Sequence, residues 1–283
     1  MEIILAKTAG FCFGVTRAVN TVYDNLEKKD NLYTYGPIIH NETVVNDLKN
    51  KGVRVVDFLE ELSDINDGCV VIRSHGVSED VYQAIEAQGL EYIDATCPFV
   101  KRIHKIVKEK SMEGYEVVII GNPTHPEVLG IKGYATGKVT VVDSAEEAQK
   151  YETTADAKVV IVSQTTFNYT KFQDLVEIFL KKGYDISVVN TICNATEERQ
   201  TEAKQIASQV DTMIVIGSRN SSNSRKLYEI CKKECQNTFF IQTLEELKLE
   251  EIPAKTCRVG ITAGASTPKN IIEEVQNYVR INF

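Results

Sequence analysis

The sequence contains a motif of strand, cysteine and helix that occurs three times, at intervals of about 90 residues. The copies read EIILAKTAGFCFGVTRAV, YIDATCPFVKRIHKIV and YDISVVNTICNATEERQ, and they place Cys12, Cys97 and Cys193 between a β-rich run and apolar residues at helical spacing. A single cysteine in such a turn is usually a small buried hydrophobe. Three in the same context indicate a shared role and a chain built from three similar modules.

Each module also carries a polar loop at a fixed distance from its cysteine. His40, His125 and Ser221 follow the three cysteines by 28 residues, in the loops GPIIHNETVV, GNPTHPEVLG and GSRNSSNSRK. A strand-like apolar run precedes the last two loops directly, and helical spacing follows them. The matched spacing predicts that these loops occupy equivalent places in the fold.

A second polar loop follows the first after 35, 40 and 45 residues in the successive modules. It lies within VVIRSHGVSED, VVIVSQTTFNY and VGITAGASTPK, where it contains His75, Thr165 and Ser266. Each again stands between a strand-like run and a helix-like run. Every module therefore presents one cysteine turn and two polar loops.

Strands that alternate with helices form parallel sheets with right-handed crossovers. We therefore predict an α/β protein with three small αβα domains, comprising residues 13–96, 97–192 and 193–283, the last completed by residues 1–12. The third module has no final strand of its own, so we expect EIILAK to close its sheet. The three domains are then related by a pseudo-threefold axis.

Ligands of parallel α/β sheets bind at the carboxyl ends of the strands, where all of these loops lie. Three domains that face a common centre bring Cys12, Cys97 and Cys193 together. Three thiolates with one open position suit zinc with a bound water, or a 4Fe–4S cluster with one iron that has no protein ligand. The absence of a C-x-x-C pair and the helix start beside each cysteine favour the cluster.

The polar loops combine imidazoles, hydroxyls and amides at helix starts, which is a chemistry suited to a phosphate or diphosphate group. Ser222 and Asn223 extend the loop of Ser221. Glu127 is a carboxylate inside this anion site, which is costly unless it is protonated or used. We interpret it as a proton donor, although the dipole of the following helix also favours an acid there.

The remaining histidine and cysteines look structural. His104 lies in a basic helix beside Arg102 and Lys105, so we expect it on a solvated face. The other four cysteines show no matched context, and we expect each to have a structural role; they are Cys69, Cys231, Cys235 and Cys257.

Composition restricts the classes of partner. The net charge of −8 disfavours binding to nucleic acid or to an anionic membrane. No apolar run approaches the roughly 20 residues that span a bilayer, and MEIILAKTAG reads as a strand rather than a signal peptide. We expect a cytoplasmic protein with reduced cysteines and a small-molecule substrate.

Nine motifs resemble, in order, those of the 4-hydroxy-3-methylbut-2-enyl diphosphate reductases, the LytB/IspH family. They are GFCFGV, GPIIHN, IRSHG, DATCPFV, GNPTHPEV, SQTT, TICNAT, GSRNSSNS and TAGAST, and they extend over essentially the whole chain. The resemblance implies an iron–sulfur oxidoreductase of the last step of the non-mevalonate isoprenoid route. That step removes an allylic hydroxyl with two electrons and two protons, and gives isopentenyl and dimethylallyl diphosphates.

The resemblance also implies roles for individual residues. Cys12, Cys97 and Cys193 would ligate one 4Fe–4S cluster with an open iron, Glu127 would deliver protons, and Thr165 would help to orient the hydroxyl. The residues that would hold the diphosphate are His40, His75, His125, Ser221, Ser222, Asn223 and Ser266. The electron donor would be a ferredoxin or a flavodoxin.

Two other functions stay open at the level of the sequence. A quinolinate synthase-like enzyme also resembles a pseudo-threefold α/β ring with three cysteines on one cluster, but acts on carboxylates. The paired histidine loops and SSNS argue against it. A non-catalytic iron–sulfur sensor predicts no turnover with reductant and usually has a separate DNA-binding or partner-binding segment, and no basic, helix-turn-helix-like region is evident.

Overall fold

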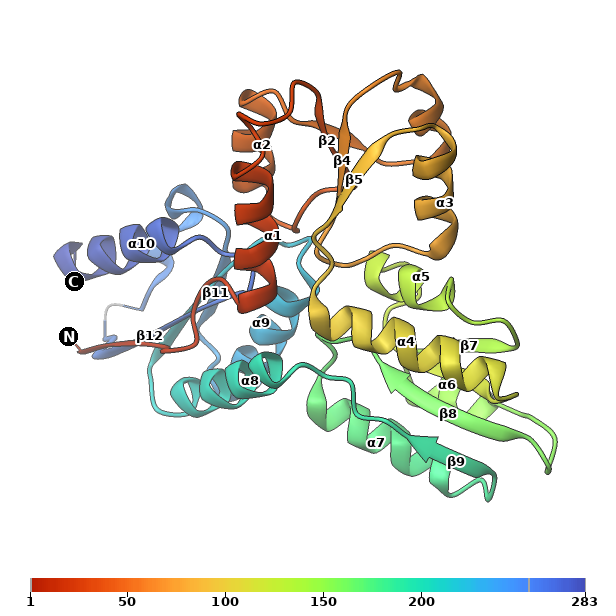
Figure 1. Ribbon diagram of the computed structural model, residues 1–283. Helices are drawn as coiled ribbons and strands as arrows, with labels where there is room; N and C mark the ends of the chain where they lie inside the picture. Colours follow the sequence, from red (N-terminus) through yellow and green to blue (C-terminus); the bar gives the residue numbers. More distant parts are fainter. Residues whose placement is uncertain (1, 254, 283) are drawn as a thin grey trace. The chain divides into compact units, whose positions relative to one another are not determined.

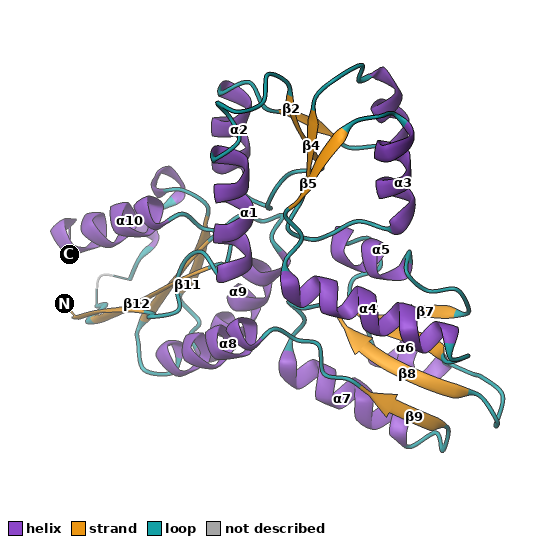
Figure 2. Cartoon of the chain, viewed as in Figure 1, coloured by secondary structure: helices purple, strands orange, loops and turns teal. Residues whose placement is uncertain are grey.

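The computed structural model describes residues 2–253 and 255–282, and its strands form three four-stranded parallel sheets (Figures 1 and 2). The first sheet has the order β3-β2-β4-β5. Its strands are β2 (Leu32–Tyr35), β3 (Arg54–Val56), β4 (Cys69–Ile72) and β5 (Glu91–Asp94). Its connecting helices are α2 (Glu42–Asn50), the 3₁₀ helix η1 (Leu59–Asp64) and α3 (Glu79–Ala87).

The second sheet repeats this order as β7-β6-β8-β9. Its strands are β6 (Glu116–Ile120), β7 (Val139–Val142), β8 (Lys158–Ser163) and β9 (Asp185–Val188). The helices of this part are α4 (Pro98–Met112), α5 (Pro126–Lys132), α6 (Ala145–Lys150) and α7 (Tyr169–Leu180). Helices α4 and α5 pack together on one face of the sheet, and α6 and α7 pack together on the other (Figure 1).

The third sheet has the equivalent order β11-β10-β12-β1, in which the N-terminal strand takes the place of a missing fourth strand. Its strands are β10 (Thr212–Ile216), β11 (Thr238–Ile241), β12 (Arg258–Ala263) and β1 (Glu2–Leu5). Strand β1 pairs with β12 so that Ile3 lies opposite Val259. The helices of this part are α8 (Asn194–Ala207), α9 (Ser222–Glu234), α10 (Lys269–Asn282) and the 3₁₀ helices η2 (Leu244–Glu246) and η3 (Leu249–Glu251). Helix α1 (Phe13–Tyr23) connects β1 to β2 of the first sheet.

The predicted α/β class with three parallel sheets is therefore confirmed, and the common strand order accounts for the sequence repeat. The contacts in space between its residues divide the chain into two compact units. Unit 1 comprises residues 1–16, 40–46 and 194–283, and unit 2 comprises residues 17–39 and 47–193. The residue boundaries of three domains and their pseudo-threefold relation stay predictions.

Burial on both faces explains why the central strands are apolar throughout. In β6, Val118 and Ile120 pack with α6 and α7, whereas Val117 and Ile119 pack with α4 and α5. A strand side chain points to alternate faces, so a sheet that is covered on both sides needs a continuous apolar run rather than an alternating one.

The strand order also determines where the loops can bind a ligand. The first and third strands of each module are neighbours, and the chain leaves them toward opposite sides of the sheet. Such a topological switch point leaves a crevice at the carboxyl ends of the two strands. In unit 2, Glu127 follows β6 and Thr165 follows β8, so both belong to one switch point.

Two adjacent residues of α7 provide a test of the second core. Phe179 is fully buried in the cluster between α7 and the sheet, whereas Leu180 is 55% exposed. We expect Phe179→Ala to lower the free energy of unfolding by about 3–5 kcal/mol, and Leu180→Ala to change it by less than about 0.5 kcal/mol. Urea unfolding measures both, and equal effects would contradict the assigned face of α7.

Candidate active site

The twelve residues that the sequence singles out divide equally between the two units, and each group is described within its own unit. Unit 2 contains His75, Cys97, His125, Glu127, Thr165 and Cys193. Unit 1 contains Cys12, His40, Ser221, Ser222, Asn223 and Ser266. Every one of them lies in a loop that follows a strand or at the start of the helix after it.

Glu127 and Thr165 form a buried pair at the switch point of the second sheet. The backbone N–H of Thr165 donates to Oε1 of Glu127 at 2.6 Å, and its hydroxyl donates to Oε2 at 2.7 Å. Glu127 is 2% exposed. Both carboxyl oxygens are therefore held in fixed positions, and the loop after β6 is joined to the loop after β8.

Burial raises the pKa of Glu127 from about 4.5 to about 7, and the two hydrogen bonds from Thr165 oppose this rise without cancelling it. A carboxyl group removed from water favours its neutral form because the charged form loses its hydration. At neutral pH this residue is thus poised between acid and base, which is the property of a general acid.

His125 caps helix α5, and its Nδ1 accepts a hydrogen bond from the backbone N–H of Glu127 at 3.1 Å. A neutral imidazole that accepts at Nδ1 carries its proton on Nε2. The ring of His75 meets that of His125 edge to face, with 5.4 Å between centroids. The two predicted histidines of unit 2 therefore lie together, and His125 bonds directly to Glu127 of the buried Glu127–Thr165 pair.

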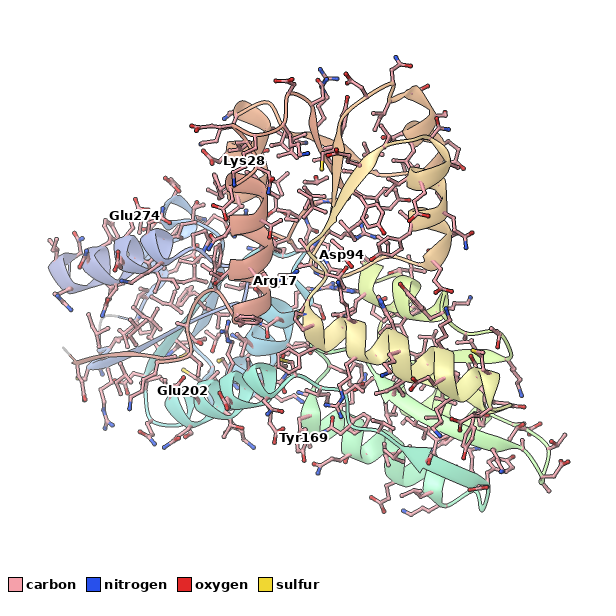
Figure 3. All side chains as sticks on the ribbon, viewed as in Figure 1. Arg17, Lys28, Asp94, Tyr169, Glu202 and Glu274 are labelled. Atoms are coloured by element: carbon pink, nitrogen blue, oxygen red, sulfur yellow. The ribbon has the colours of Figure 1, made fainter. Side chains whose placement is uncertain are left out.

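Two of the three cysteine turns are fixed within unit 2. The N–H of Cys97 donates to the carbonyl of Ser74 at 3.0 Å, and the N–H of Cys193 donates to the carbonyl of Thr165 at 3.0 Å. Thr165 therefore bonds both to the backbone of Cys193, through its carbonyl, and to Glu127, through its N–H and hydroxyl. Arg17 contributes a further restraint, since its guanidinium donates to the carbonyls of Asp94 and Thr96 just before Cys97 (Figure 3).

The third cysteine turn follows the same rule in unit 1. The N–H of Cys12 donates to the carbonyl of Ala265 at 3.2 Å, and the carbonyl of Cys12 accepts from Thr16 inside helix α1. Next to Ala265, the hydroxyl of Ser266 donates to the carbonyl of His40 at 3.0 Å. The segment with His40 is therefore attached to the loop that also holds Cys12.

The loop before α9 presents buried polar groups. Ser221 caps the helix by accepting from the N–H of Ser224. Asn223 is 4% exposed, and neither polar atom of its side chain has a hydrogen-bond partner among the described residues. A buried polar atom without a partner costs free energy, so this amide indicates a place where a polar ligand binds.

Two residues of the site were missed by the sequence analysis. Asn41 is 2% exposed, its Oδ1 accepts from the N–H of Val44, and its Nδ2 has no partner among the residues that the structure describes. Gln164 accepts from the N–H of Asn122 and donates to Thr166, which links the loops after β6 and β8. In the quoted motifs Asn41 directly follows His40 and Gln164 directly precedes Thr165, and this adjacency could have identified them from the sequence.

The expectation that His104 lies on a solvated face is wrong. Its side chain is 4% exposed, stacks on Tyr134 with 4.2 Å between centroids, and burial lowers its pKa to about 4. The basic neighbours were misleading, because the residue falls on the same helical stripe as Val100 and Val107. A Cβ on Gly76 would lie 2.6 Å from Cε1 of His104, so the ring directly supports the loop of His75.

The cysteines differ in exposure, and three of the four that were expected to be structural are more buried than the three in the cysteine turns. Cys12, Cys97 and Cys193 are partly exposed. Cys69, Cys231 and Cys235 are buried, and burial raises the pKa of Cys231 to about 12. Cys257 is exposed, so its thiol is not part of a core.

Comparison with known proteins identifies the family. The sequence matches the profile described as LytB protein over residues 3–280. The chain belongs to the LytB protein family. The 4-hydroxy-3-methylbut-2-enyl diphosphate reductase of Caldanaerobacter subterraneus subsp. tengcongensis is 46% identical over 278 residues, which cover 97% of this chain and 95% of the relative. The protein of that name from Geobacter sulfurreducens is 48% identical over 275 residues, with the same shares of the two chains.

Two solved structures share the fold. The E-1-hydroxy-2-methyl-but-2-enyl-4-diphosphate reductase of Plasmodium falciparum superposes with a TM-score of 0.93 at 28% identity, over 98% of this chain and 87% of the other. A second structure, described as (E)-4-hydroxy-3-methyl-but-2-enyl diphosphate reductase, the terminal enzyme of the non-mevalonate pathway, gives 0.69 at 45% identity, over 99% and 100%. In the described part of this LytB protein, no helix is long and apolar enough to cross a membrane.

The raised pKa of Glu127 makes a prediction about stability. The folded protein binds this proton more tightly than the unfolded chain, so the contribution is complete below about pH 4.5 and is lost as the pH rises through about 7. A shift of this size corresponds to about 3 kcal/mol. Glu127→Gln lacks the titration, so the unfolding free energy of the wild type should fall relative to the variant by roughly that amount between pH 4.5 and 8. Parallel pH profiles in urea unfolding would show that Glu127 titrates normally.

Proposed function

We propose that this protein reduces 4-hydroxy-3-methylbut-2-enyl diphosphate to isopentenyl and dimethylallyl diphosphates, the last step of the non-mevalonate isoprenoid pathway. The relatives that are 46–48% identical along nearly the whole chain carry the name of this reductase. The reaction consumes two electrons and two protons and releases the hydroxyl group as water. The observation that supports it best is the buried carboxyl group of Glu127, with a pKa near 7 and both oxygens held by Thr165.

Cys12, Cys97 and Cys193 are proposed to hold one 4Fe–4S cluster with one iron open to the substrate. The residues fit such a group, since the three are partly exposed, each precedes a helix start, and each turn is held by a backbone hydrogen bond. Thiolate ligands are favoured by the positive end of a helix dipole. When bound, the cluster supplies electrons and Lewis acidity at the leaving hydroxyl group.

The polar loops are proposed to bind the diphosphate group. The proposed ligands are His40, His75, His125, Ser221, Ser222, Asn223 and Ser266. The amide of Asn223, buried with no partner among the described residues, supports this role. Nε2–H of neutral His125 is a donor suited to a phosphate oxygen, because Nδ1 already accepts from Glu127. Neutral donors and helix starts bind an anion without lysine or arginine.

The proton chemistry is assigned to Glu127 and its hydroxyl neighbour. Protonated Glu127 donates to the departing hydroxyl group, whose release as hydroxide would otherwise be unfavourable. Oγ1 of Thr165 already donates to Oε2 of Glu127, so its lone pairs remain to accept from the substrate hydroxyl and to orient it. The electrons are proposed to come from a ferredoxin or a flavodoxin.

The test is turnover of the anaerobically reconstituted protein with the allylic diphosphate and reduced methyl viologen. Wild-type protein should form both isopentenyl and dimethylallyl diphosphates. Its kcat should decline above about pH 7, because Glu127 loses its proton there. A complete cluster without turnover would exclude the reductase function.

Matched variants test the individual roles. We expect Cys97→Ser to abolish turnover and reduce the iron content, whereas Cys257→Ser, at an exposed cysteine, should retain both. Glu127→Gln should keep the cluster and the substrate KM, and lower kcat by about 100-fold or more. Cluster content is measured by iron and sulfide analysis, and full activity in Glu127→Gln would remove this residue from the proton path.

A further inference from the structure

Glu42, the first residue of helix α2, accepts three side-chain hydrogen bonds in unit 1. Its Oε1 accepts from Oγ of Ser218 at 3.0 Å and from Nδ2 of Asn220 at 2.6 Å. Its Oε2 accepts from Nε2 of Gln242 at 2.7 Å. No lysine or arginine of the described residues forms an ion pair with this carboxylate, so its bonds are to neutral donors alone.

The three donors come from the loops that carry the proposed diphosphate ligands or adjoin them. Ser218 lies three residues before Ser221 and Asn220 lies directly before it, and the N–H of Asn220 donates to Oγ of Ser218. Gln242 follows strand β11, and the N–H of Gly217 donates to the carbonyl at the end of that strand. Glu42 thus contacts the loop after β10 and the loop after β11 at once.

The short segment of residues 40–42 is also bonded at its other end, at His40. Two residues before Glu42, the carbonyl of His40 accepts from Ser266, which lies in the loop after β12. Residues 40–42 are therefore bonded to the loops after β10, β11 and β12. Ser266 positions the backbone of His40, while Glu42 provides the contacts to the other two loops.

The chemistry of a carboxylate suits this task. Its two oxygens offer about four lone-pair sites, so one side chain satisfies donors from two loops. Burial alone would raise the pKa of Glu42, but the bonds from Ser218, its own backbone N–H, Asn220 and Gln242 outweigh burial and lower it. The group is ionised at neutral pH, and the donors that bond to it stabilise its negative charge.

We propose that Glu42 is a positioning residue of the diphosphate site, which fixes the loop of Ser221, Ser222 and Asn223 relative to the segment of His40. This inference rests on the proposed function of the polar loops. It adds a residue that itself makes no contact with the reacting atoms and acts through Ser218, Asn220 and Gln242.

Three variants test this role in the cluster-loaded protein. Glu42→Ala removes all three bonds, and we expect KM for the allylic diphosphate and Ki for inorganic diphosphate each to rise at least tenfold, with kcat within threefold. Gln242→Ala removes one bond, and should raise both by about threefold. Glu42→Gln should stay within threefold of wild type, because its amide oxygen serves Ser218 and Asn220 while Gln242 turns its own amide to accept from the new NH₂ group.

Glu273→Ala is the matched control, since Glu273 is an exposed acid of α10 in the same unit. Iron content and thermal melting establish that each variant is folded and loaded. Unchanged KM and Ki in Glu42→Ala, or a fall in kcat or iron content without a change in KM and Ki, would overturn the role. A wild-type protein without turnover would instead refute the proposed function, and calorimetric binding of inorganic diphosphate to wild type and Glu42→Ala would still decide the role of Glu42.

Discussion

A backbone hydrogen bond from each cysteine turn is the constraint on which the rest of the site depends. Cys12 donates to the carbonyl of Ala265, Cys97 to that of Ser74 and Cys193 to that of Thr165. In each case the acceptor lies in the second polar loop of the same sheet, because the strand before the cysteine pairs with the strand before that loop. Strand pairing therefore places the backbone of each of these three cysteines beside the second polar loop of its sheet.

The common strand order places the polar loops and the cysteine turn at equivalent positions in each module. The first and third strands end at a switch point, where loops leaving toward opposite sides open a crevice for a ligand. The fourth strand lies at one edge, and its turn carries the cysteine. In the third module β1 fills this place, which explains why the first cysteine comes only twelve residues from the N-terminus although its sheet is built from the C-terminal part of the chain.

The alternation of strands and helices, the place of the N-terminal strand in the third sheet and the positions of the polar loops were predictable, because spacing and apolar periodicity are properties of the sequence itself. The burial of His104 followed from the same periodicity, yet its basic neighbours suggested solvent. The role of Glu42 was not predictable, because its three donors lie 176 to 200 residues away and nothing local distinguishes it from a favourable acid at a helix start. Contacts of that sequence separation depend on tertiary packing.

Two glutamates at helix starts show how surroundings decide a role. Glu42 and Glu127 are both in the first turn of a helix, and both accept hydrogen bonds from residues of distant loops. Glu42 is only partly buried and receives three side-chain bonds, so its pKa falls and it remains an anion that holds loops together. Glu127 is buried and receives two bonds from Thr165, so desolvation prevails and its pKa rises to about 7. Because a charge that is fully compensated by donors has little tendency to take up a proton, only the under-compensated carboxylate can deliver one at neutral pH.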